Sequence, residues 1–181
     1  MSAADQGGAP RPDWPLEVHG ALRSAGISQV SYVPDAGHAR LIRLCQDDPA
    51  LRSVPLTSEQ EGVGLAAGAH LGGARSVLLM QSSGIGNCVN ALSMVQVCGF
   101  PFLTLVTMRG EWGEFNPWQV PMGQSAAQCL RTAGVIVEPV HEAGRIAPAV
   151  AAAARLAFDS SRAVAVLISQ RILGAKSFAE H

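Results

Sequence analysis

The sequence predicts an α/β fold: a single doubly wound, mostly parallel six-stranded sheet with helices on both faces. Six short runs rich in apolar and β-branched residues alternate with helical segments along the 181 residues. Such alternation is typical of right-handed βαβ units in a parallel sheet. The run 76–81 is apolar almost throughout, as expected for a strand that helices cover on both faces.

In the first half of the chain, glycine and proline signals separate the elements. A helix over 14–24 ends at Gly26, and the β-branched and aromatic run 28–33 predicts the first strand. The turn 34–37 (Pro-Asp-Ala-Gly) leads into the second helix. The other elements expected here are helices over 38–47 and 59–71, the latter ended by Gly72-Gly73, and strands over 52–56 and 76–81.

The second half repeats the alternation. The glycine-rich turn 82–87 opens a helix, and Gly99 and Pro101 precede the fourth strand. The segment 109–123 has neither a helical nor a strand period and is expected to be a long loop. The other elements expected here are helices over 87–97, 125–133 and 144–158, and strands over 102–108, 135–140 and 163–169.

Length and composition indicate one tightly packed domain. A chain of 181 residues is about one domain, and 48% of its residues are hydrophobic while only 15% are charged. So few charges indicate that another subunit covers part of the surface. The net charge is −1 and no basic block occurs, so nothing indicates binding to nucleic acid.

The N-terminal segment, the longest uncharged run and the cysteines together predict a cytoplasmic protein that is not inserted in a membrane. Residues 1–13 are expected to be a disordered tail without the apolar segment of a secretory signal, residues 14–173 the folded domain, and residues 174–181 a short tail. Glycines, asparagines and a proline interrupt the long uncharged run 76–108, so it does not predict a membrane span. The four cysteines lack CxxC spacing and are expected to be buried thiols.

Glu59 is the main candidate for a functional residue. Ser58 and Glu61 have the spacing of a capping box, which places Glu59 on the first helical turn just beyond a strand. Ligands of α/β folds bind at such strand-to-helix junctions. The alternative is structural, because the helix dipole favours acidic residues in any first turn.

Three further strand ends carry polar or glycine-rich sequence, at 34–38, 81–87 and 109–111. The carboxyl ends of parallel strands lie at one edge of a sheet, so these segments are expected to converge with Glu59. The turn with Gly84 and Gly86 lacks the third glycine of a dinucleotide fingerprint. Its glycines and Asn87 either let the backbone approach a flat ring or only form a tight turn.

Arg109 ends a buried strand and begins the long loop. Long loops in compact domains are usually functional, and a guanidinium suits a substrate with an anionic group. The alternative is an ion pair with Glu111 or Glu114. Three aromatic residues of the loop would form a lid or a patch under a partner: Trp112, Phe115 and Trp118.

Two histidines, His38 and His70, are considered as candidates for proton transfer. His38 follows the first-strand turn and is a candidate for proton transfer, whereas His70 is expected to be packed or at an interface. The sequence contains no Gly-x-Ser-x-Gly, P-loop or HExxH motif, so it does not support a serine hydrolase, a P-loop enzyme or a zinc protease of that class.

Taken together, these motifs resemble the pyrimidine-binding (PYR) domain of thiamine diphosphate decarboxylases. The resemblance is carried by 59–68, 80–92 and 108–111, with Val33-Pro34-Asp35 as the first-strand loop, and it covers 15–172. It is strongest to the enzymes that decarboxylate phosphonopyruvate and to the alpha subunits of those that decarboxylate sulfopyruvate.

The resemblance implies a role for each candidate residue. Glu59 would hydrogen-bond the aminopyrimidine ring and so help to activate the thiazolium carbon that attacks a 2-oxo acid. The residues beside the pyrimidine would be Gln81, Ser83, Gly84, Ile85, Gly86 and Asn87. Asp35, Gln81 and Arg109 would contact substrate, with Arg109 at a sulfonate or phosphonate. Ala36 stands where the family often has a polar residue, so Asp35 or the catalytic candidate His38 would act instead.

The resemblance also implies that this chain holds only half of an active site. The family needs a second domain that binds the diphosphate through Mg2+ with a Gly-Asp-Gly motif, and this sequence has none. A separate beta subunit would supply that domain and the metal, in a homodimer-based or alpha/beta hetero-oligomer. The alternatives are a non-catalytic scaffold or regulatory subunit of such an enzyme and, less well supported, a nucleotide-binding module.

Overall fold

The computed structural model describes residues 12–174 and confirms the doubly wound α/β fold. The sheet has the order β2-β1-β3-β4-β6-β5, and every neighbouring pair is parallel. The strands are β1 Ile27–Tyr32, β2 Arg52–Pro55, β3 Arg75–Gln81, β4 Phe102–Thr107, β5 Ile136–Val140 and β6 Ala163–Ile168. Residues 1–11 and 175–181, to which most of the predicted tails belong, lie outside the described residues.

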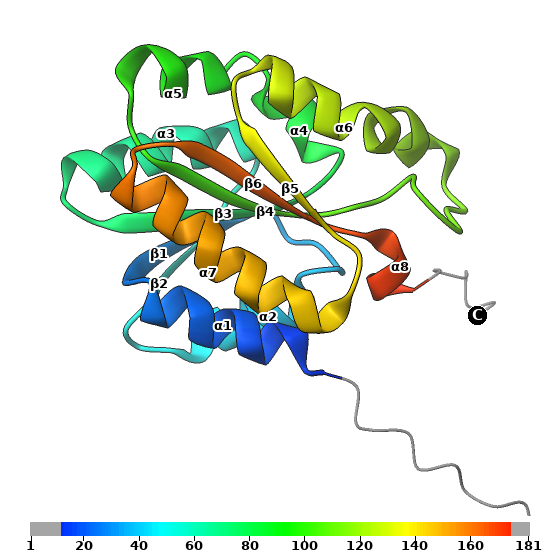
Figure 1. The fold of residues 1–181 in the computed structure, drawn as a ribbon, viewed down its shortest axis with the longest axis horizontal. Coiled ribbons are helices and arrows are strands. Elements are labelled where there is room, and N and C mark those ends of the chain that lie inside the picture. Colours follow the sequence, from blue (N-terminus) through cyan, green and yellow to red (C-terminus); the bar gives the residue numbers. More distant parts are fainter. Residues whose placement is uncertain (1–11, 175–181) are drawn as a thin grey trace, which may run out of the picture.

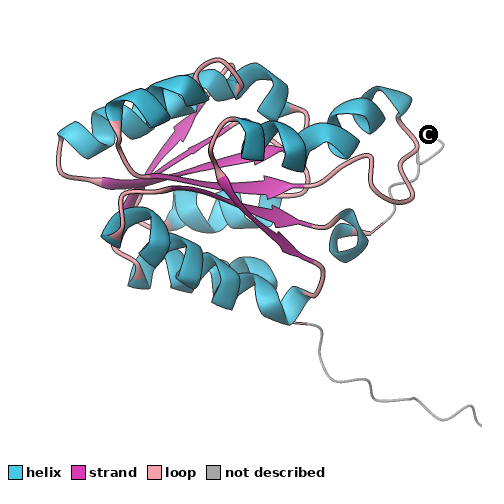
Figure 2. Ribbon diagram, turned by 45° about the horizontal axis from the view of Figure 1, so that its top comes forward, coloured by secondary structure: helices cyan, strands magenta, loops and turns pink. Residues whose placement is uncertain are grey.

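Helices cover the sheet in two layers (Figures 1 and 2). The layer of α1 Trp14–Ser24, α2 Ala39–Asp47 and α7 Ala143–Asp159 packs on one face. The layer of α3 Glu59–Leu71, α4 Gly84–Cys88, α5 Leu92–Cys98 and α6 Val120–Thr132 packs on the other. Two short elements, the 3-10 helix η1 Pro117–Gln119 and α8 Gln170–Leu173, lie at the carboxyl edge of the sheet.

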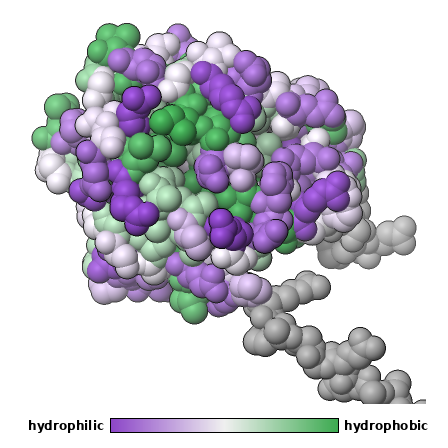
Figure 3. Space-filling model, in the orientation of Figure 1, coloured by the Kyte–Doolittle hydropathy of each residue, from purple (hydrophilic) through white to green (hydrophobic). Residues whose placement is uncertain are grey.

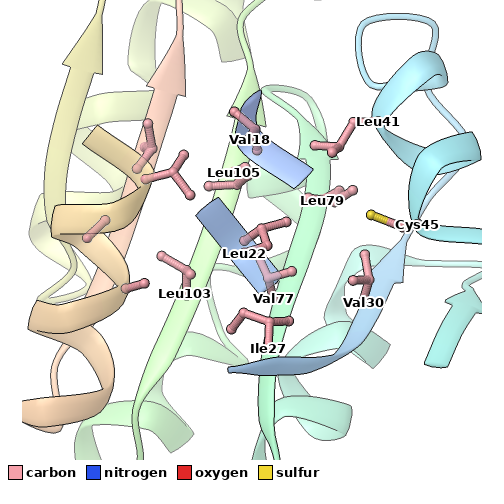
Figure 4. Packing of buried hydrophobic residues seen from close by; sticks show 14 of the residues in the cluster. Val18, Leu22, Ile27, Val30, Leu41, Cys45, Val77, Leu79, Leu103 and Leu105 are labelled. Atoms are coloured by element: carbon pink, nitrogen blue, oxygen red, sulfur yellow. The ribbon is translucent and has the colours of Figure 1, made fainter. Parts of the chain in front are cut away.

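Alternating side chains of the central strands fill both layers. Val77 and Leu79 of β3 belong to the core under α1, α2 and α7, whereas Leu78 and Met80 belong to the core under α3 to α6. Figure 4 shows the first of these cores, in which Val18 and other apolar side chains of the helices meet those of β3 and β4. Two-sided burial accounts for the continuous apolar runs in the sequence.

The direction of the connections reverses at the carboxyl edge of the sheet, between β1 and β3. From β1 the chain moves outward to β2 and then crosses back to β3 on the other side of β1. The loops after β1 and β3 therefore leave in opposite directions, which is where doubly wound sheets bind ligands. The loops that follow β1, β2, β3 and β4 carry the candidate residues.

Three local predictions were wrong. The helix expected over 87–97 is two helices, because bonds from Ser93 N to Asn90 O and from Met94 N to Ala91 O tighten the backbone into a turn between α4 and α5. The long loop ends at 116, since Asn116 caps a 3-10 turn at Trp118 N and α6 follows at once. The short helix α8 was not expected.

Several apolar side chains remain exposed. Figure 3 shows a hydrophobic patch surrounded by hydrophilic side chains on one face of the molecule. The largest exposed apolar side chains include Leu71, Val97 and Trp118. Of the four free thiols, Cys45 and Cys88 are buried, but Cys98 is exposed, contrary to prediction. Among residues 12–174, no helix is long and apolar enough to cross a membrane.

Candidate active site at the carboxyl edge of the sheet

Hydrogen bonds join the ends of β1, β3 and β4. Ser82 N donates to Thr107 O at 3.0 Å, and Arg109 N donates to Ser82 Oγ at 3.1 Å. Thr107 Oγ1 donates to Asp35 at 2.5 Å. The predicted segments at 34–38, 81–87 and 109–111 therefore meet at one edge, as expected from the parallel sheet.

Glu59 begins α3 at this edge and is 6% exposed. Asn87 Nδ2 donates to its Oε2 atom at 2.7 Å. Its Oε1 atom lies against Gly84, where an added Cβ would come within 2.4 Å of that oxygen. Oε1 accepts no hydrogen bond from the residues that the structure describes. One oxygen of a nearly buried carboxylate is thus fixed and the other is available.

The position of Glu59 depends on how α3 begins and packs. The predicted capping box is wrong, because the Ser58 side chain makes no capping bond. Glu61 instead accepts from the backbone N–H and the hydroxyl of Thr57, at 3.1 and 2.6 Å. Farther along the turn, an added Cβ on Gly62 would lie 2.4 Å from Leu78, so this glycine lets α3 lie directly on β3.

The turn after β3 places its residues in two environments. Gly86 and Asn87 are exposed, and Gln81 and Ser83 are half-buried. Ile85 is fully buried in the core. Of these residues, Gly84 and Asn87 lie against the Glu59 carboxylate.

Asp35 belongs to the edge, whereas His38 does not. Asp35 is half-buried and also accepts from His38 N at 3.2 Å. The His38 ring is fully buried, with Nε2 at 3.1 Å from Leu105 O and its edge against Trp14. Burial lowers the pKa of His38, although the nearby Asp35 carboxylate opposes the shift. This position inside the core does not agree with proton transfer by His38. His70 is exposed and its ring lies 6.5 Å from that of Phe100.

Arg109 forms an ion pair with Glu114, which was one of the predicted alternatives to substrate binding. Its Nε and Nη2 atoms donate to the two Glu114 oxygens, both at 2.6 Å, and its residue exposure is 8%. This bidentate geometry is the strongest form of the pair. The Arg109 guanidinium lowers the pKa of Glu114 to about 2. The Arg109 guanidinium, which was expected to bind a substrate anion, therefore binds Glu114 instead.

Sequence reasoning missed Gln170, which is 1% exposed at the start of α8. Its Oε1 atom accepts from Glu111 N and Trp112 N, at 3.1 and 3.2 Å, and its Nε2 donates to Glu114 at 2.9 Å. The signal was available, since Ser169-Gln170 follows the sixth strand and hence reaches the same edge as the other four segments.

Comparison with known proteins identifies this arrangement. The model of the family described as "Thiamine pyrophosphate enzyme, N-terminal TPP binding domain" matches residues 18–116, which include Glu59, the glycine turn and Arg109. The chain belongs to this thiamine pyrophosphate enzyme family. Thiamine pyrophosphate is thiamine diphosphate, so the resemblance to a PYR domain is confirmed.

Relatives narrow the place of the chain within the family. It is 35% identical over 152 residues to sulfopyruvate decarboxylase subunit alpha of Methanothermobacter thermautotrophicus, covering 83% of this chain and 92% of that one. It is 39% identical over 116 residues to the same subunit of Methanococcus maripaludis, covering 64% and 70%. A phosphonopyruvate decarboxylase of Streptomyces viridochromogenes is 37% identical over 94 residues, covering 51% of this chain and 24% of that one.

A solved structure supports the fold. The 2-oxoglutarate:ferredoxin oxidoreductase of Magnetococcus marinus matches 95% of this chain and 33% of its own, with a TM-score of 0.71 and 15% identity. At that identity, the match shows that the fold is shared, and no more.

The site of this family member fits an aminopyrimidine ring. A buried carboxylate with one available oxygen suits a ring N–H, and Gly84 and Gly86 leave the rim free of side chains. Asn87 and Gln81 add amide groups beside it. Within residues 12–174, no group of three or more His, Cys, Asp or Glu side chains is arranged to hold a metal ion.

The contact between Gly84 and Glu59 can be tested by a double-mutant cycle. We expect Gly84→Ala to lower the free energy of unfolding by about 1–2 kcal/mol, because the new methyl group displaces the buried carboxylate. In a Glu59→Ala background the same change should cost almost nothing. Gly64→Ala is the matched control on α3: it has open space around it, and helix propensity should make it stabilising by up to about 1 kcal/mol. Equal costs of Gly84→Ala in both backgrounds, measured by urea unfolding, would contradict the contact.

Glu114 should make stability depend on acid pH. The folded-state pKa is about 2 against a usual 4.5, so its ionisation stabilises the fold fully above pH 4.5 and progressively less as the pH falls toward 2. Over that range the wild type should lose roughly 3 kcal/mol more of its unfolding free energy than Glu114→Gln does. Asp159→Asn, which removes an exposed partner of Arg75, should follow the wild-type curve. Parallel curves for wild type and Glu114→Gln in urea unfolding would refute the assignment.

Proposed function

We propose that this chain is the alpha subunit of a thiamine diphosphate-dependent 2-oxo acid decarboxylase, with sulfopyruvate or phosphonopyruvate as substrate and an aldehyde and CO2 as products. The observation that carries the proposal is the Glu59 carboxylate, nearly buried at the carboxyl edge with Oε1 available over Gly84. A separate beta subunit would hold the diphosphate through Mg2+. The similarity to alpha subunits of sulfopyruvate decarboxylase supports this assignment.

Glu59 would hold a proton on the cofactor ring. When bound, thiamine diphosphate supplies the nucleophilic carbon and the electron sink for loss of CO2. Glu59 Oε1 would accept a hydrogen bond from a ring nitrogen and so favour its protonated form. Asn87 keeps Oε2 in place at 2.7 Å, which orients the free oxygen. Burial strengthens this charged hydrogen bond by excluding water from it.

The substrate would lie among Gln81, Asp35 and the start of the Arg109 loop. Gln81 is half-buried at the end of β3 and is the polar side chain of this group with an uncommitted amide. Asp35 is held by Thr107 at 2.5 Å. The ion pair with Glu114 weakens the case for Arg109 as the ligand of a sulfonate or phosphonate. We therefore propose that Gln81 contacts the substrate and that Arg109 acts on it only if Glu114 releases the guanidinium.

The central experiment reconstitutes the complete enzyme. The chain is co-expressed with a candidate beta chain that carries a Gly-Asp-Gly domain, and CO2 release is measured with sulfopyruvate, phosphonopyruvate and pyruvate, with and without thiamine diphosphate and Mg2+. Turnover of an anionic substrate that needs both additions supports the proposal. An assembled complex that turns over none of the three substrates would instead favour the scaffold or regulatory alternative.

Glu59→Gln should lower kcat at least 100-fold in this complex, because the amide cannot stabilise a protonated ring. Glu61→Gln is the matched control: it makes the same change on the same turn of α3, at an exposed residue whose contacts are with Thr57. It should keep wild-type kcat and wild-type assembly. Undiminished turnover by Glu59→Gln would exclude the assigned role.

Asn87→Asp should shift the pH profile. It places a second carboxylate at hydrogen-bond distance from Glu59, and like charges so close raise the pKa of the pair. The acidic limb of kcat/KM should therefore move to higher pH by about one unit or more. Asn90→Asp, a change of the same kind at an exposed residue, should leave the limb in place. An unshifted limb in Asn87→Asp would show that Asn87 does not hold Glu59 in the working enzyme.

A further inference from the structure

The loop between β4 and α6 is closed at its base. Gly110 has φ +74°, and an added Cβ would lie 2.6 Å from Gln119 O. An added Cβ on Gly123 would lie 1.8 Å from Arg109 O. The two glycines thus let the backbones at the two ends of the loop touch. Residues 110–119 form a compact loop of the Ω type, seen beside α8 in Figure 1.

One carboxylate fills the inside of this Ω loop. Glu114 accepts five hydrogen bonds, two from Arg109 and one each from Gly110 N, Asn116 N and Gln170 Nε2. Its side chain is 4% exposed. A buried charge with all of these donors is costly to remove from its place, so it holds the loop in one conformation.

The C-terminal helix ties the loop from outside. Gln170 N donates to Glu111 at 2.9 Å, and Ser169 Oγ donates to the same carboxylate oxygen at 3.0 Å. With the bonds from the Gln170 side chain to the loop, α8 fixes the first half of the loop to the end of β6. The Ω loop is therefore ordered by contacts on both its inner and its outer side.

This ordered loop presents aromatic side chains to the surface. Trp118 is 84% exposed, Trp112 is 42% exposed and Phe115 is 38% exposed. Arg171 lies over the Trp112 ring at 5.2 Å, and Arg109 lies over the Phe115 ring at 5.8 Å. These contacts hold the Trp112 and Phe115 rings, and the backbone at Trp118 is held by the bond from its N–H to Asn116 Oδ1 at 3.1 Å. The loop therefore loses little conformational freedom on association, and Trp is enriched among the residues that contribute most to interfaces.

The loop is joined to the Glu59 site by direct contacts. Gly86 follows the glycine that faces Glu59, and an added Cβ there would lie 3.3 Å from Met122 Sδ. Met122 precedes Gly123, which touches Arg109 at the base of the loop. The aromatic surface and the available carboxylate oxygen thus lie along one continuous edge. A chain that completes a cofactor cleft at Glu59 approaches this same edge.

We propose that residues 110–119 are a preassembled anchor for the subunit that carries the diphosphate-binding domain, with Trp118 as its main contact. This inference rests on the proposed function, which requires such a subunit. The contact surface of the partner should be apolar to receive Trp118 and should carry an acidic rim near Arg171, which is exposed and lies over the Trp112 ring. The anchor is built before the partner arrives, because Glu114 and Gln170 already hold it.

The experiment measures the dissociation constant between this chain and the candidate beta chain, without cofactor, by titration calorimetry. Trp118→Ala should weaken binding at least tenfold, since it removes the most exposed ring of the loop. The matched controls are Leu71→Ala and Val97→Ala, at the ends of α3 and α5 near the opposite edge of the sheet; these residues are 87% and 85% exposed. Both controls should bind within twofold of wild type.

A second variant tests whether the order of the loop matters. Glu114→Gln changes no aromatic residue of the loop but removes the negative charge that holds the loop in one conformation. It should weaken binding at least threefold while far-ultraviolet circular dichroism shows the wild-type fold. Binding by Glu114→Gln equal to that of wild type would refute preassembly.

Three binding results would overturn the anchor: Trp118→Ala binds within twofold of wild type, Leu71→Ala or Val97→Ala loses binding instead, or the wild-type chain does not bind the beta chain. A fall in kcat/KM of Trp118→Ala with an unchanged dissociation constant would also overturn it. That result would make the loop part of the substrate site. Sedimentation compares the wild-type chain with Trp118→Ala, each without the beta chain. Self-association that is lost in the variant would assign the loop to a second copy and refute the proposal.

Decarboxylation assays on the same samples separate this inference from the proposed function. A tight complex that depends on Trp118 but releases no CO2 would refute the proposed substrates and keep the anchor. An active complex whose affinity does not depend on Trp118 would keep the function and refute the anchor.

Discussion

The close approach of Gly84 to the Glu59 carboxylate is the constraint on which the site depends. An added Cβ at position 84 would come within 2.4 Å of Oε1, so the carboxylate can lie at the edge of the core only where a side chain is missing. This explains why a glycine stands in the turn that follows β3. It also links two βα units, since Glu59 follows β2 and Gly84 follows β3. Neither unit could form the site alone.

The order of the strands brings these units together. β2 and β3 are separated in the sheet by β1, yet α3 crosses over β1 and packs on β3 through Gly62. A helix with a larger residue at that position would stand farther from the sheet and carry Glu59 away from the glycine turn. Gly62 of α3 is therefore a requirement of close packing and of the site at once.

The fold and the position of Glu59 at the start of α3 were predictable because they rest on patterns of local sequence. Two-sided burial made the strands continuous apolar runs, and glycine marked the turns, so the sheet and the segments at its edge could be placed. What failed depended on how a turn closes or on contacts that form only when the chain folds back on itself. Whether Arg109 binds a ligand or Glu114 depends on how the loop folds back, and the burial of His38 against Leu105 O depends on the packing of β4. Gln170 acts across 58 residues on Trp112, at a distance along the chain that no local pattern reports.

The two carboxylates at this edge, Glu114 and Glu59, differ in how many hydrogen-bond donors they contact. This difference distinguishes a structural carboxylate from one that can bind a ligand. Glu114 accepts five hydrogen bonds, including a bidentate pair with Arg109, so neither oxygen is left for a ligand. From the part of the chain that the structure describes, Glu59 accepts one, from Asn87, and its other oxygen faces a glycine. A carboxylate saturated with donors stabilises the fold and is held in its charged form. A carboxylate that is buried with a single donor loses its hydration without a full set of hydrogen bonds in return. A protonated ring nitrogen would donate a hydrogen bond to its second oxygen. The sparse environment of Glu59 is thus what a site for such a ring requires, and the saturated environment of Glu114 is what a fixed loop requires.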